Sequence, residues 1–289
     1  MFMKIEFEKT ITTEQAGSNV TDFLAQETAI SKQKIKDALS KGACWLKRGQ
    51  KGRKRLRKAK EILQKNDQIF LYYDSELLSR KPEGAQCLVD AQGYSVWFKP
   101  AGMVAQGNDW CDHLAITRLA EQTLEPKRTS FLIHRLDRET AGLIVIAHKQ
   151  GVAGAISREF QNRKVEKFYR CLVSGKAPES GEIVNKLDGK PAHTIFTRLH
   201  YNVDRDYSDL YVEILTGRTH QIRRHLNQIN HPVMGDPRYG SDNKNLAGMQ
   251  LFAVKLAFNC PIQRRKVTFE LSNEFLKQHS NSELSDSTP

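Results

Sequence analysis

The sequence predicts an α+β protein in which a small N-terminal α/β domain precedes a central, mostly antiparallel mixed sheet. Strand-like runs recur from Leu88 onward with only occasional helical segments between them, a pattern that favours such a sheet. The polar stretch Ser75–Ala85 contains Pro and Gly and separates this region from a shorter one. The expected boundaries are 1–78 for the N-terminal domain, 79–87 for a linker, 88–277 for the C-terminal domain and 278–289 for a disordered tail.

In the N-terminal domain, apolar residues at helical spacing predict helices over Asn19–Leu24 and Lys32–Leu39. Ser31 is the expected N-cap of the second helix, because its hydroxyl can accept from a free backbone N–H of the first turn. Gly42 is expected to end that helix, since Gly readily adopts the left-handed conformation. The short apolar runs that follow predict strands at Ala43–Leu46 and Ile69–Tyr73.

The C-terminal domain contains most of the predicted strands. Alternating or continuous apolar runs predict strands at Tyr94–Phe98, Leu143–Ala147, Phe168–Val173, Thr194–Leu199, Leu210–Leu215 and Lys266–Leu271. Helical spacing predicts helices near His113–Gln122, Gly151–Gln161 and Thr219–Gln228.

The charge of the chain indicates a polyanionic partner. The formal net charge is +12, and the segment Lys47–Lys60 holds nine basic residues in fourteen with no acidic one. Such a segment is either a solvated loop or an arm that binds nucleic-acid phosphates. The second interpretation is favoured because the run has no internal partner for its charge and phosphate binding would release counterions. The candidate contacts are Arg53, Lys54, Arg55, Arg57 and Lys58.

Composition argues against several other classes. The five cysteines are scattered and never form Cys-x-x-Cys, which disfavours a disulfide framework or a zinc knuckle and favours a reducing compartment. Cys111-Asp112-His113 lacks a second ligand pair at suitable spacing. No Walker loop or dinucleotide-binding glycine pattern is present, so no cofactor and no metal are expected. No signal peptide or membrane-spanning run is apparent, and a cytoplasmic, monomeric protein is expected.

The most informative segment is His134-Arg135-Leu136-Asp137-Arg138-Glu139-Thr140-Ala141-Gly142, which leads into an apolar strand. Nearby positive charge favours the ionised form of a carboxylate, so Asp137 is a candidate nucleophile or base. The alternative from charge alone is an Arg135–Asp137–Arg138 salt bridge at the strand entry. Glu139 is expected to be a surface partner of Arg138.

Five motifs together resemble the RluA-type pseudouridine synthases, which isomerise uridine in RNA. They are Lys99-Pro100-Ala101-Gly102, the segment around Asp137, Lys167-Phe168-Tyr169, the basic stretch Gly217–Leu226 and the following stretch His231–Gly240. They occur in the family's order across roughly residues 90 to 272. Residues 17–74 resemble an S-four-type RNA-binding domain. Three positions depart from the family pattern, namely Ala141 for Ser and Phe252 and Cys260 for His.

The resemblance implies a site. Asp137 would act on the ribose, either by covalent addition or by removing a ribose proton, and the sequence leaves both routes open. Arg223 would pair with Asp137, and Tyr169 would stack on the base. Contacts to RNA are expected from Arg135, Arg138, Arg218 and Arg224, whereas His220 and His225 are interpreted as helix residues.

The substrate that the resemblance implies is structured RNA, with ribosomal RNA favoured and transfer RNA as the other option. A non-catalytic RNA-binding or ribosome-assembly factor on the same fold is the alternative function.

Overall fold

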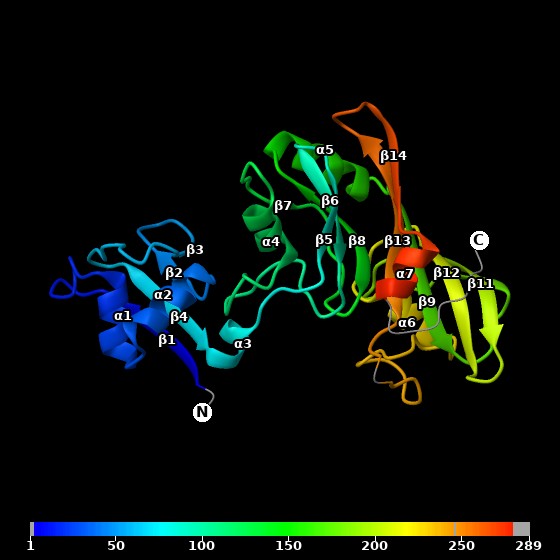
Figure 1. Ribbon diagram of the computed structural model, residues 1–289, viewed down its shortest axis with the longest axis horizontal. Coiled ribbons are helices and arrows are strands. Elements are labelled where there is room, and N and C mark those ends of the chain that lie inside the picture. Colours follow the sequence, from blue (N-terminus) through cyan, green and yellow to red (C-terminus); the bar gives the residue numbers. More distant parts are fainter. Residues whose placement is uncertain (1–2, 246, 280–289) are drawn as a thin grey trace. The chain divides into compact units, whose positions relative to one another are not determined.

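The computed structural model describes residues 3–245 and 247–279, and it divides into two compact units (Figure 1). The N-terminal unit consists of Met1–Pro82 and Gln106–Gln122, and the C-terminal unit consists of Glu83–Ala105 and Thr123–Pro289. The first division falls inside the expected linker. The expected boundaries differ from this division in one respect, because 106–122 was placed in the C-terminal domain. Residues 280–289 of the expected tail lie outside the described residues.

The N-terminal unit is an antiparallel four-stranded sheet with helices packed on it. The strands are β1 (Lys4–Thr10), β2 (Cys44–Lys47), β3 (Lys54–Arg55) and β4 (Gln68–Asp74), in the order β1-β4-β2-β3. The helices are α1 (Val20–Thr28), α2 (Lys32–Ser40), the short α3 (Ser75–Ser79) and α4 (Ile116–Thr123). Alternate residues of β4 are buried, and its Ile69 and Leu71 join Leu24 and Ile35 of α1 and α2 in one apolar cluster.

The helix ends of this unit follow from local chemistry. Ser31 caps α2 by accepting a hydrogen bond from the backbone N–H of Lys34, as predicted. Asn19 caps α1 by accepting from Thr21. The segment 106–122 belongs to this unit because Cys111 and Leu114 pack into the apolar cluster. Helix α3 occupies the beginning of the polar stretch Ser75–Ala85 and ends at the first residue of the expected linker.

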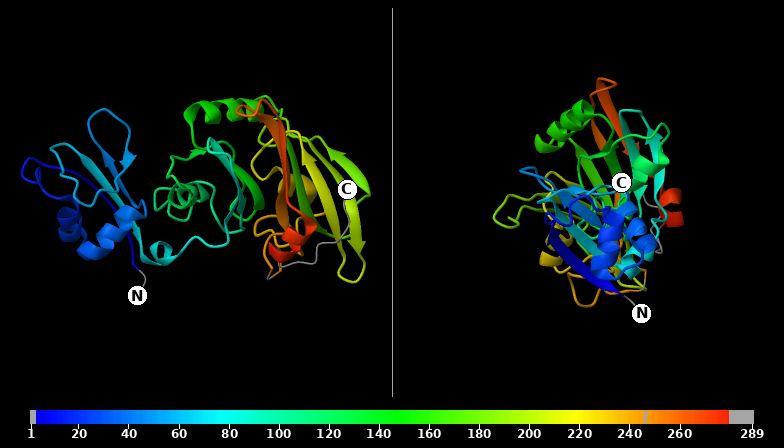
Figure 2. Two further views of the ribbon diagram at one scale, coloured as in Figure 1. Left: turned by 45° about the horizontal axis from the view of Figure 1, so that its top comes forward. Right: turned by 90° about the vertical axis from the view of Figure 1, so that its left-hand side faces the viewer.

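The C-terminal unit contains a ten-stranded sheet (Figures 1 and 2). Eight strands form the order β10-β11-β12-β9-β13-β8-β6-β5, while β14 pairs with β13 and β7 pairs with β8. Only the β8–β13 pairing is parallel, so the predicted mostly antiparallel mixed sheet is confirmed. The strands are β5 (Gln86–Asp90), β6 (Tyr94–Lys99), β7 (Phe131–Leu132), β8 (Ala141–Ala147), β9 (Glu166–Ser174), β10 (Ser180–Ile183), β11 (Thr194–Asn202), β12 (Tyr207–Ile214), β13 (Leu251–Cys260) and β14 (Arg265–Glu270).

Three helices accompany this sheet: α5 (Gln150–Gln161), α6 (Gln221–Gln228) and α7 (Asn273–His279). Helix α6 packs against the apolar cluster formed by β9, β12 and β13 through Ile222 and Leu226. The other face of the central strands is covered by the larger cluster that includes Val96, Leu143 and Phe258. Phe252 and Cys260, which depart from the family pattern, are both buried in that cluster.

The central strand β13 was not predicted from the sequence. Its side chains are buried along almost all of its length, so apolar residues do not alternate with polar ones and the period of two is lost. Strand β13 pairs with both β8 and β9, and it thereby joins the two halves of the sheet.

The junction of β8 and β13 requires glycine. Gly142 has φ 119°, and a Cβ built on it would lie 2.3 Å from the carbonyl oxygen of Ala253. Only a residue without a side chain permits this approach. The junction lies directly after the turn that carries Asp137, so the close strand packing fixes where that turn leaves the sheet.

Candidate active site

Asp137 lies in a turn between β7 and β8 whose backbone is held from several sides. The N–H of Thr140 donates to the carbonyl of Asp137 at 3.1 Å, which closes the turn. The carbonyl of Arg138 accepts from the N–H of Gly102 at 2.8 Å and from Lys99 Nζ at 3.2 Å. The Asp137 side chain keeps 21% of its surface exposed, so the turn presents a carboxylate to the adjoining pocket.

Lys99 is an unusual anchor for this turn because it is entirely buried. Its ammonium also donates to the carbonyls of Pro100 and Met103, at 3.0 and 2.8 Å. Burial lowers the pKa of Lys99 to about 7, although the carboxylates of Glu139 and Asp137 oppose this shift. The Lys99-Pro100-Ala101-Gly102 motif is therefore a structural turn that supports the site.

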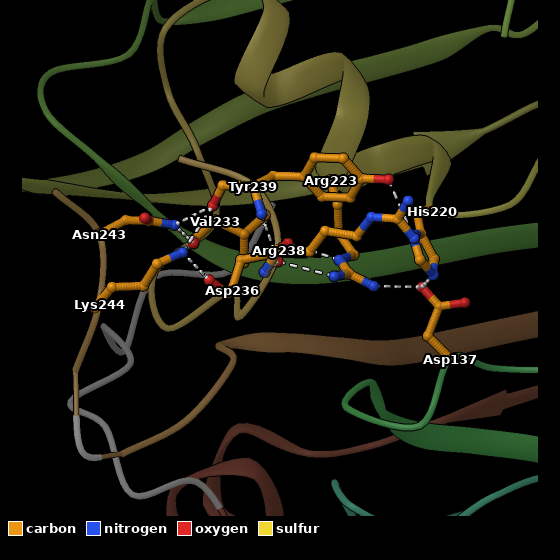
Figure 3. A network of polar contacts seen from close by, with 9 residues as sticks. All are labelled: Asp137, His220, Arg223, Val233, Asp236, Arg238, Tyr239, Asn243 and Lys244. Carbon is orange, nitrogen blue, oxygen red and sulfur yellow. Dashed lines mark hydrogen bonds and ion pairs between the residues drawn. The ribbon is translucent and has the colours of Figure 1, made fainter. Parts of the chain in front are cut away.

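Arg223 on α6 connects Asp137 to a second carboxylate (Figure 3). Its Nη1 donates to Asp137 Oδ2 at 3.2 Å, while Nε and Nη2 donate to the two oxygens of Asp236 at 2.6 and 2.8 Å. Asp236 is buried, and its Oδ1 also accepts from the N–H groups of Arg238 and Tyr239. Burial alone would raise the pKa of Asp236, but these hydrogen bonds outweigh it and the pKa is lowered.

His220 approaches the same carboxylate from the other side (Figure 3). Its Nε2 lies 3.8 Å from Asp137 Oδ2, and its Nδ1 lies 3.0 Å from the hydroxyl of Tyr239. Burial lowers the pKa of His220; the cations Arg223 and Arg238 act in the same direction, and the carboxylates Asp137 and Asp236 oppose it. His220 was expected within a helix, but it precedes α6 as the N-cap residue, with a left-handed backbone.

Asp137 and Tyr169 line one pocket of the C-terminal unit. Tyr169 projects from β9, and Arg135, Thr140, Ile214 and Leu251 are among the other lining residues, together with the segment 217–223. Burial and then the charge of Asp137 raise the pKa of Tyr169, which keeps its hydroxyl protonated. The pocket thus combines a carboxylate, an aromatic face and several arginines, as expected for a site that holds a nucleotide.

The loop before α6 is ordered by Gln221. Its side-chain oxygen accepts from the Thr216 hydroxyl and from the N–H of Arg218, and its amide donates to the carbonyl of His193 and the hydroxyl of Thr194. Gln221 is 3% exposed, so these bonds lie inside the protein. They shape the wall of the pocket that is formed by residues 217–220.

The alternative that charge alone suggested, a salt bridge of Asp137 with Arg135 and Arg138, is wrong. Arg138 pairs with the neighbouring Glu139 at 2.6 Å, as expected for that carboxylate, and Arg135 is exposed at the pocket. The cation at Asp137 comes instead from Arg223, which is 86 residues away in sequence. Charge pattern along the chain could not reveal a partner on another element.

The remaining arginines of the predicted set have local partners. Arg218 donates from Nε to the carbonyl of Pro191 at 3.0 Å, and it lines the pocket. Arg224 pairs with the exposed Asp188 at 2.9 Å, whereas the adjacent Arg223 is buried. His225 is a buried helix residue, as expected, and its ring contacts Thr194 and the carbonyl of Asn185.

The expectation that the basic segment Lys47–Lys60 lacks internal partners is wrong for its arginines. Arg53 donates to both oxygens of Asp109, and Arg55 and Arg57 both pair with Asp112. These acids belong to the segment 106–122, which folds onto the N-terminal unit. Arg48 likewise pairs with Asp67 and Glu61. Among the candidate contacts, Arg53, Lys54 and Lys58 are exposed, but Arg53 is held by Asp109.

Sequence reasoning missed His220, Asp236 and Tyr239 as parts of the site. Asp236 and Tyr239 lie in the quoted motif His231–Gly240, but no role was attached to them. The available signal was Asp236 itself, an acid within a motif of a basic chain, since a buried arginine needs a carboxylate partner.

In the described part of the chain, no cluster of three or more His, Cys, Asp or Glu side chains could hold a metal ion. None of the described helices is both long and apolar enough to cross a membrane.

Comparison with known proteins places the site in a family context. A family model described as RNA pseudouridylate synthase matches residues 93–228. Ribosomal large subunit pseudouridine synthase D of Neisseria meningitidis serogroup B is 34% identical over 203 residues, which cover 60% of this chain and 54% of the relative. tRNA pseudouridine synthase C of Haemophilus ducreyi is 36% identical over 174 residues, which cover 51% of this chain and 70% of the relative.

The chain therefore spans about half the length of the first curated relatives that it matches. Among solved structures, human RNA pseudouridylate synthase domain containing 1 superposes with a TM-score of 0.58 at 23% identity, covering 71% of this chain and 91% of that one. This likeness confirms the fold of the C-terminal unit.

Proposed function

This chain belongs to the RNA pseudouridylate synthase family, and on that premise we propose that it converts specific uridines of structured RNA to pseudouridine. The observation that carries the proposal is the pairing of Asp137 with Arg223 at 3.2 Å, at the pocket that Tyr169 lines. The reaction breaks the bond between ribose C1′ and uracil N1 and joins C1′ to C5, while C5 loses a proton and N1 gains one. It neither adds nor removes electrons.

Asp137 is the proposed reactive group. A carboxylate can add to C1′ as the uracil leaves, or it can remove the proton on C2′, and the geometry is compatible with both routes. Arg223 supports either route by holding the ionised carboxylate in one orientation. The aromatic ring of Tyr169 offers a surface against which the detached uracil can stack during its rotation.

The nucleotide must leave its stack in the RNA to reach this pocket. Arg135 and Arg218 lie at the pocket, and Arg138 and Arg224 lie on neighbouring surface, where they can contact phosphates on either side of the extruded nucleotide. Lys54 and Lys58 supply exposed charge on the N-terminal unit, which we propose is an S-four-type RNA-binding domain. Arg53, Arg55 and Arg57 can contribute only insofar as RNA competes with their carboxylate partners.

The relatives named for ribosomal and transfer RNA keep both substrate classes open, and we propose ribosomal RNA as the first to test. We propose that the protein needs no metal or organic cofactor, because uridine isomerisation requires none. We also propose that it acts as a monomer in the cytoplasm.

The test compares the parent with Asp137→Asn on the same RNA. Ribosomal and transfer RNA transcripts, which lack modifications, are incubated with each protein, and pseudouridine is mapped at nucleotide resolution. We expect product with the parent, none with Asp137→Asn, and similar RNA binding by both. The exposed Asp204→Asn is the matched control and should behave as the parent. Binding without product by the parent on every RNA would favour the non-catalytic alternative.

A further inference from the structure

We propose that His220 is a positioning residue for Asp137 and that Tyr239 sets the tautomer in which His220 acts. The proposal rests on the proposed function, because it concerns the orientation of the carboxylate that carries the reaction. It assigns roles to two side chains that lie outside the Asp137–Arg223 pair. Figure 3 shows the His220 ring between the Tyr239 hydroxyl and the Asp137 carboxylate.

The two oxygens of the Asp137 carboxylate have different surroundings. Oδ2 faces both Arg223 Nη1, at 3.2 Å, and His220 Nε2, at 3.8 Å. Oδ1 has no hydrogen-bond partner among the described residues. The Arg223 contact is a hydrogen bond, whereas the His220 nitrogen at 3.8 Å is beyond hydrogen-bond distance and approaches the same oxygen as a polar neighbour. Both favour one rotation of the carboxylate about its Cβ–Cγ bond. The unpaired Oδ1 is therefore the oxygen left for the ribose.

Tyr239 determines which nitrogen of His220 carries the proton. An ionised carboxylate can only accept, so a favourable contact requires a hydrogen on Nε2. The lowered pKa of His220 keeps the ring neutral at neutral pH, and a neutral ring then has a lone pair on Nδ1. The Tyr239 hydroxyl, 3.0 Å away, can donate to that lone pair. Without this donor the other tautomer becomes available, and it would point a lone pair at Asp137.

The Tyr239 ring is itself held in place. The guanidinium groups of Arg223 and Arg238 lie 5.1 and 5.7 Å from its centroid, and the His220 ring meets it edge to face. Removal of the hydroxyl alone would leave these ring contacts intact. Tyr239→Phe therefore isolates the hydrogen bond to His220.

The backbone of His220 supports a functional role. His220 has φ 54° and ψ 29°, the left-handed conformation that residues with a side chain rarely adopt. Such conformations cost free energy and persist where the surroundings enforce them, often at active sites. Glycine adopts this conformation readily, so His220→Gly removes the ring without straining the chain.

The first experiment measures kcat and KM for Tyr239→Phe. We expect kcat to fall about tenfold, which corresponds to the loss of one hydrogen bond, with little change in KM or in thermal stability. Tyr201→Phe is the matched control, because the Tyr201 hydroxyl donates to Asp206 on a hairpin away from the pocket. A kcat for Tyr239→Phe equal to that of Tyr201→Phe would overturn the tautomer assignment.

The second experiment tests rescue of His220→Gly. We expect kcat to fall by about tenfold or more and to recover in part when imidazole is added. 1-Methylimidazole should not rescue, because it cannot donate a proton to Asp137 while accepting one from Tyr239. Equal activation by both compounds, or a kcat equal to that of the parent without any addition, would overturn the proposal. His220→Asn, which also tolerates the left-handed conformation, provides the same comparison if the glycine variant is unstable.

These outcomes are separate from a failure of the proposed function. An inactive parent would refute the function itself. If the parent is active, Asp137→Asn is inactive, and both Tyr239→Phe and His220→Gly turn over normally, only the roles of His220 and Tyr239 are refuted.

Discussion

Arg223 is bound more closely to Asp236 than to Asp137. Two of its nitrogens lie 2.6 and 2.8 Å from the Asp236 oxygens, whereas the contact to Asp137 is a single one of 3.2 Å. The guanidinium is therefore fixed by a buried carboxylate that faces away from the pocket. Its Nη1 is thereby left in a defined direction for the carboxylate that faces the pocket.

We predict that Asp236→Asn will lower both stability and turnover. The amide keeps the shape, but the buried Arg223 loses its charged partner, which should cost about 3–5 kcal/mol of unfolding free energy. Denaturant unfolding and single-turnover rates at a temperature where the variant is folded measure the two effects. Asp188→Asn, which removes the exposed partner of the adjacent Arg224, is the control for stability and should leave the free energy of unfolding nearly unchanged. Similar losses in both variants would contradict the special role of Asp236.

Asp236→Asn should also change the response of stability to acid. The folded pKa of Asp236 lies below its unfolded value, so its contribution is present above the unfolded pKa and is lost as pH falls through the folded pKa. The parent should therefore lose stability more steeply than the variant below about pH 4. Urea unfolding at several acidic pH values measures the two slopes. Parallel curves would show that Asp236 does not contribute.

Lys99 should make the stability of the protein depend on pH in the neutral to alkaline range. Its folded pKa is about 7, against about 10.4 in the unfolded chain. The unfolded chain then binds more protons between these values, so the Lys99 contribution to stability rises with pH across that window. In Lys99→Met that rise should be absent, and the difference between parent and variant should grow by up to about 1.4 kcal/mol per pH unit. Urea unfolding from about pH 7 to about pH 9 checks this. A constant difference would show that Lys99 stays charged.

Tyr169 is expected to act through its ring and its hydroxyl separately. Tyr169→Phe should lower the single-turnover rate, and Tyr169→Leu should in addition weaken capture of the target RNA, because stacking contributes about 1–3 kcal/mol per base. Rates and binding for both variants distinguish these effects. If neither variant differs from the parent, Tyr169 only packs against the core cluster that it borders.

The basic segment offers a matched pair of double variants. Lys54→Gln with Lys58→Gln removes exposed charge, and it should weaken RNA binding and flatten the dependence of affinity on salt. Arg55→Gln with Arg57→Gln leaves the carboxylate of Asp112 without its cations, and it should lower stability by about 1–3 kcal/mol. Salt titrations of RNA affinity and thermal unfolding separate the two roles. Unchanged salt dependence in the lysine variant would mean that the segment does not contact phosphates.

Part of the site could be predicted from the sequence because its motifs are contiguous. Asp137, Tyr169 and Arg223 each lie in a short motif with its own pattern, and the structure brings Asp137 and Arg223 into contact. The roles of Asp236 and Tyr239 depend on contacts between separate elements, which a linear pattern does not encode. The same reason explains Arg53, Arg55 and Arg57 of the basic segment, whose carboxylate partners lie more than 50 residues away.

The fold shows a similar division. The uninterrupted apolar run of β8 and the helical apolar spacing of α2 were predicted, because each pattern is written in the sequence. Strand β13 was missed because Lys255 and Asn259 interrupt its apolar run, so it neither alternates nor runs continuously, and only its place between β8 and β9 explains its composition.

The segment 106–122 determines how this protein can be dissected. The chain changes unit after Pro82, after Ala105 and again after Gln122, so no single cut separates the two units. A fragment that ends at residue 82 would lack Cys111 and Leu114 from its apolar cluster, and a fragment that begins at residue 83 would expose them to water. The N-terminal unit therefore cannot be exchanged with that of a relative as one continuous segment. Such an exchange must transfer residues 1–82 and 106–122 together.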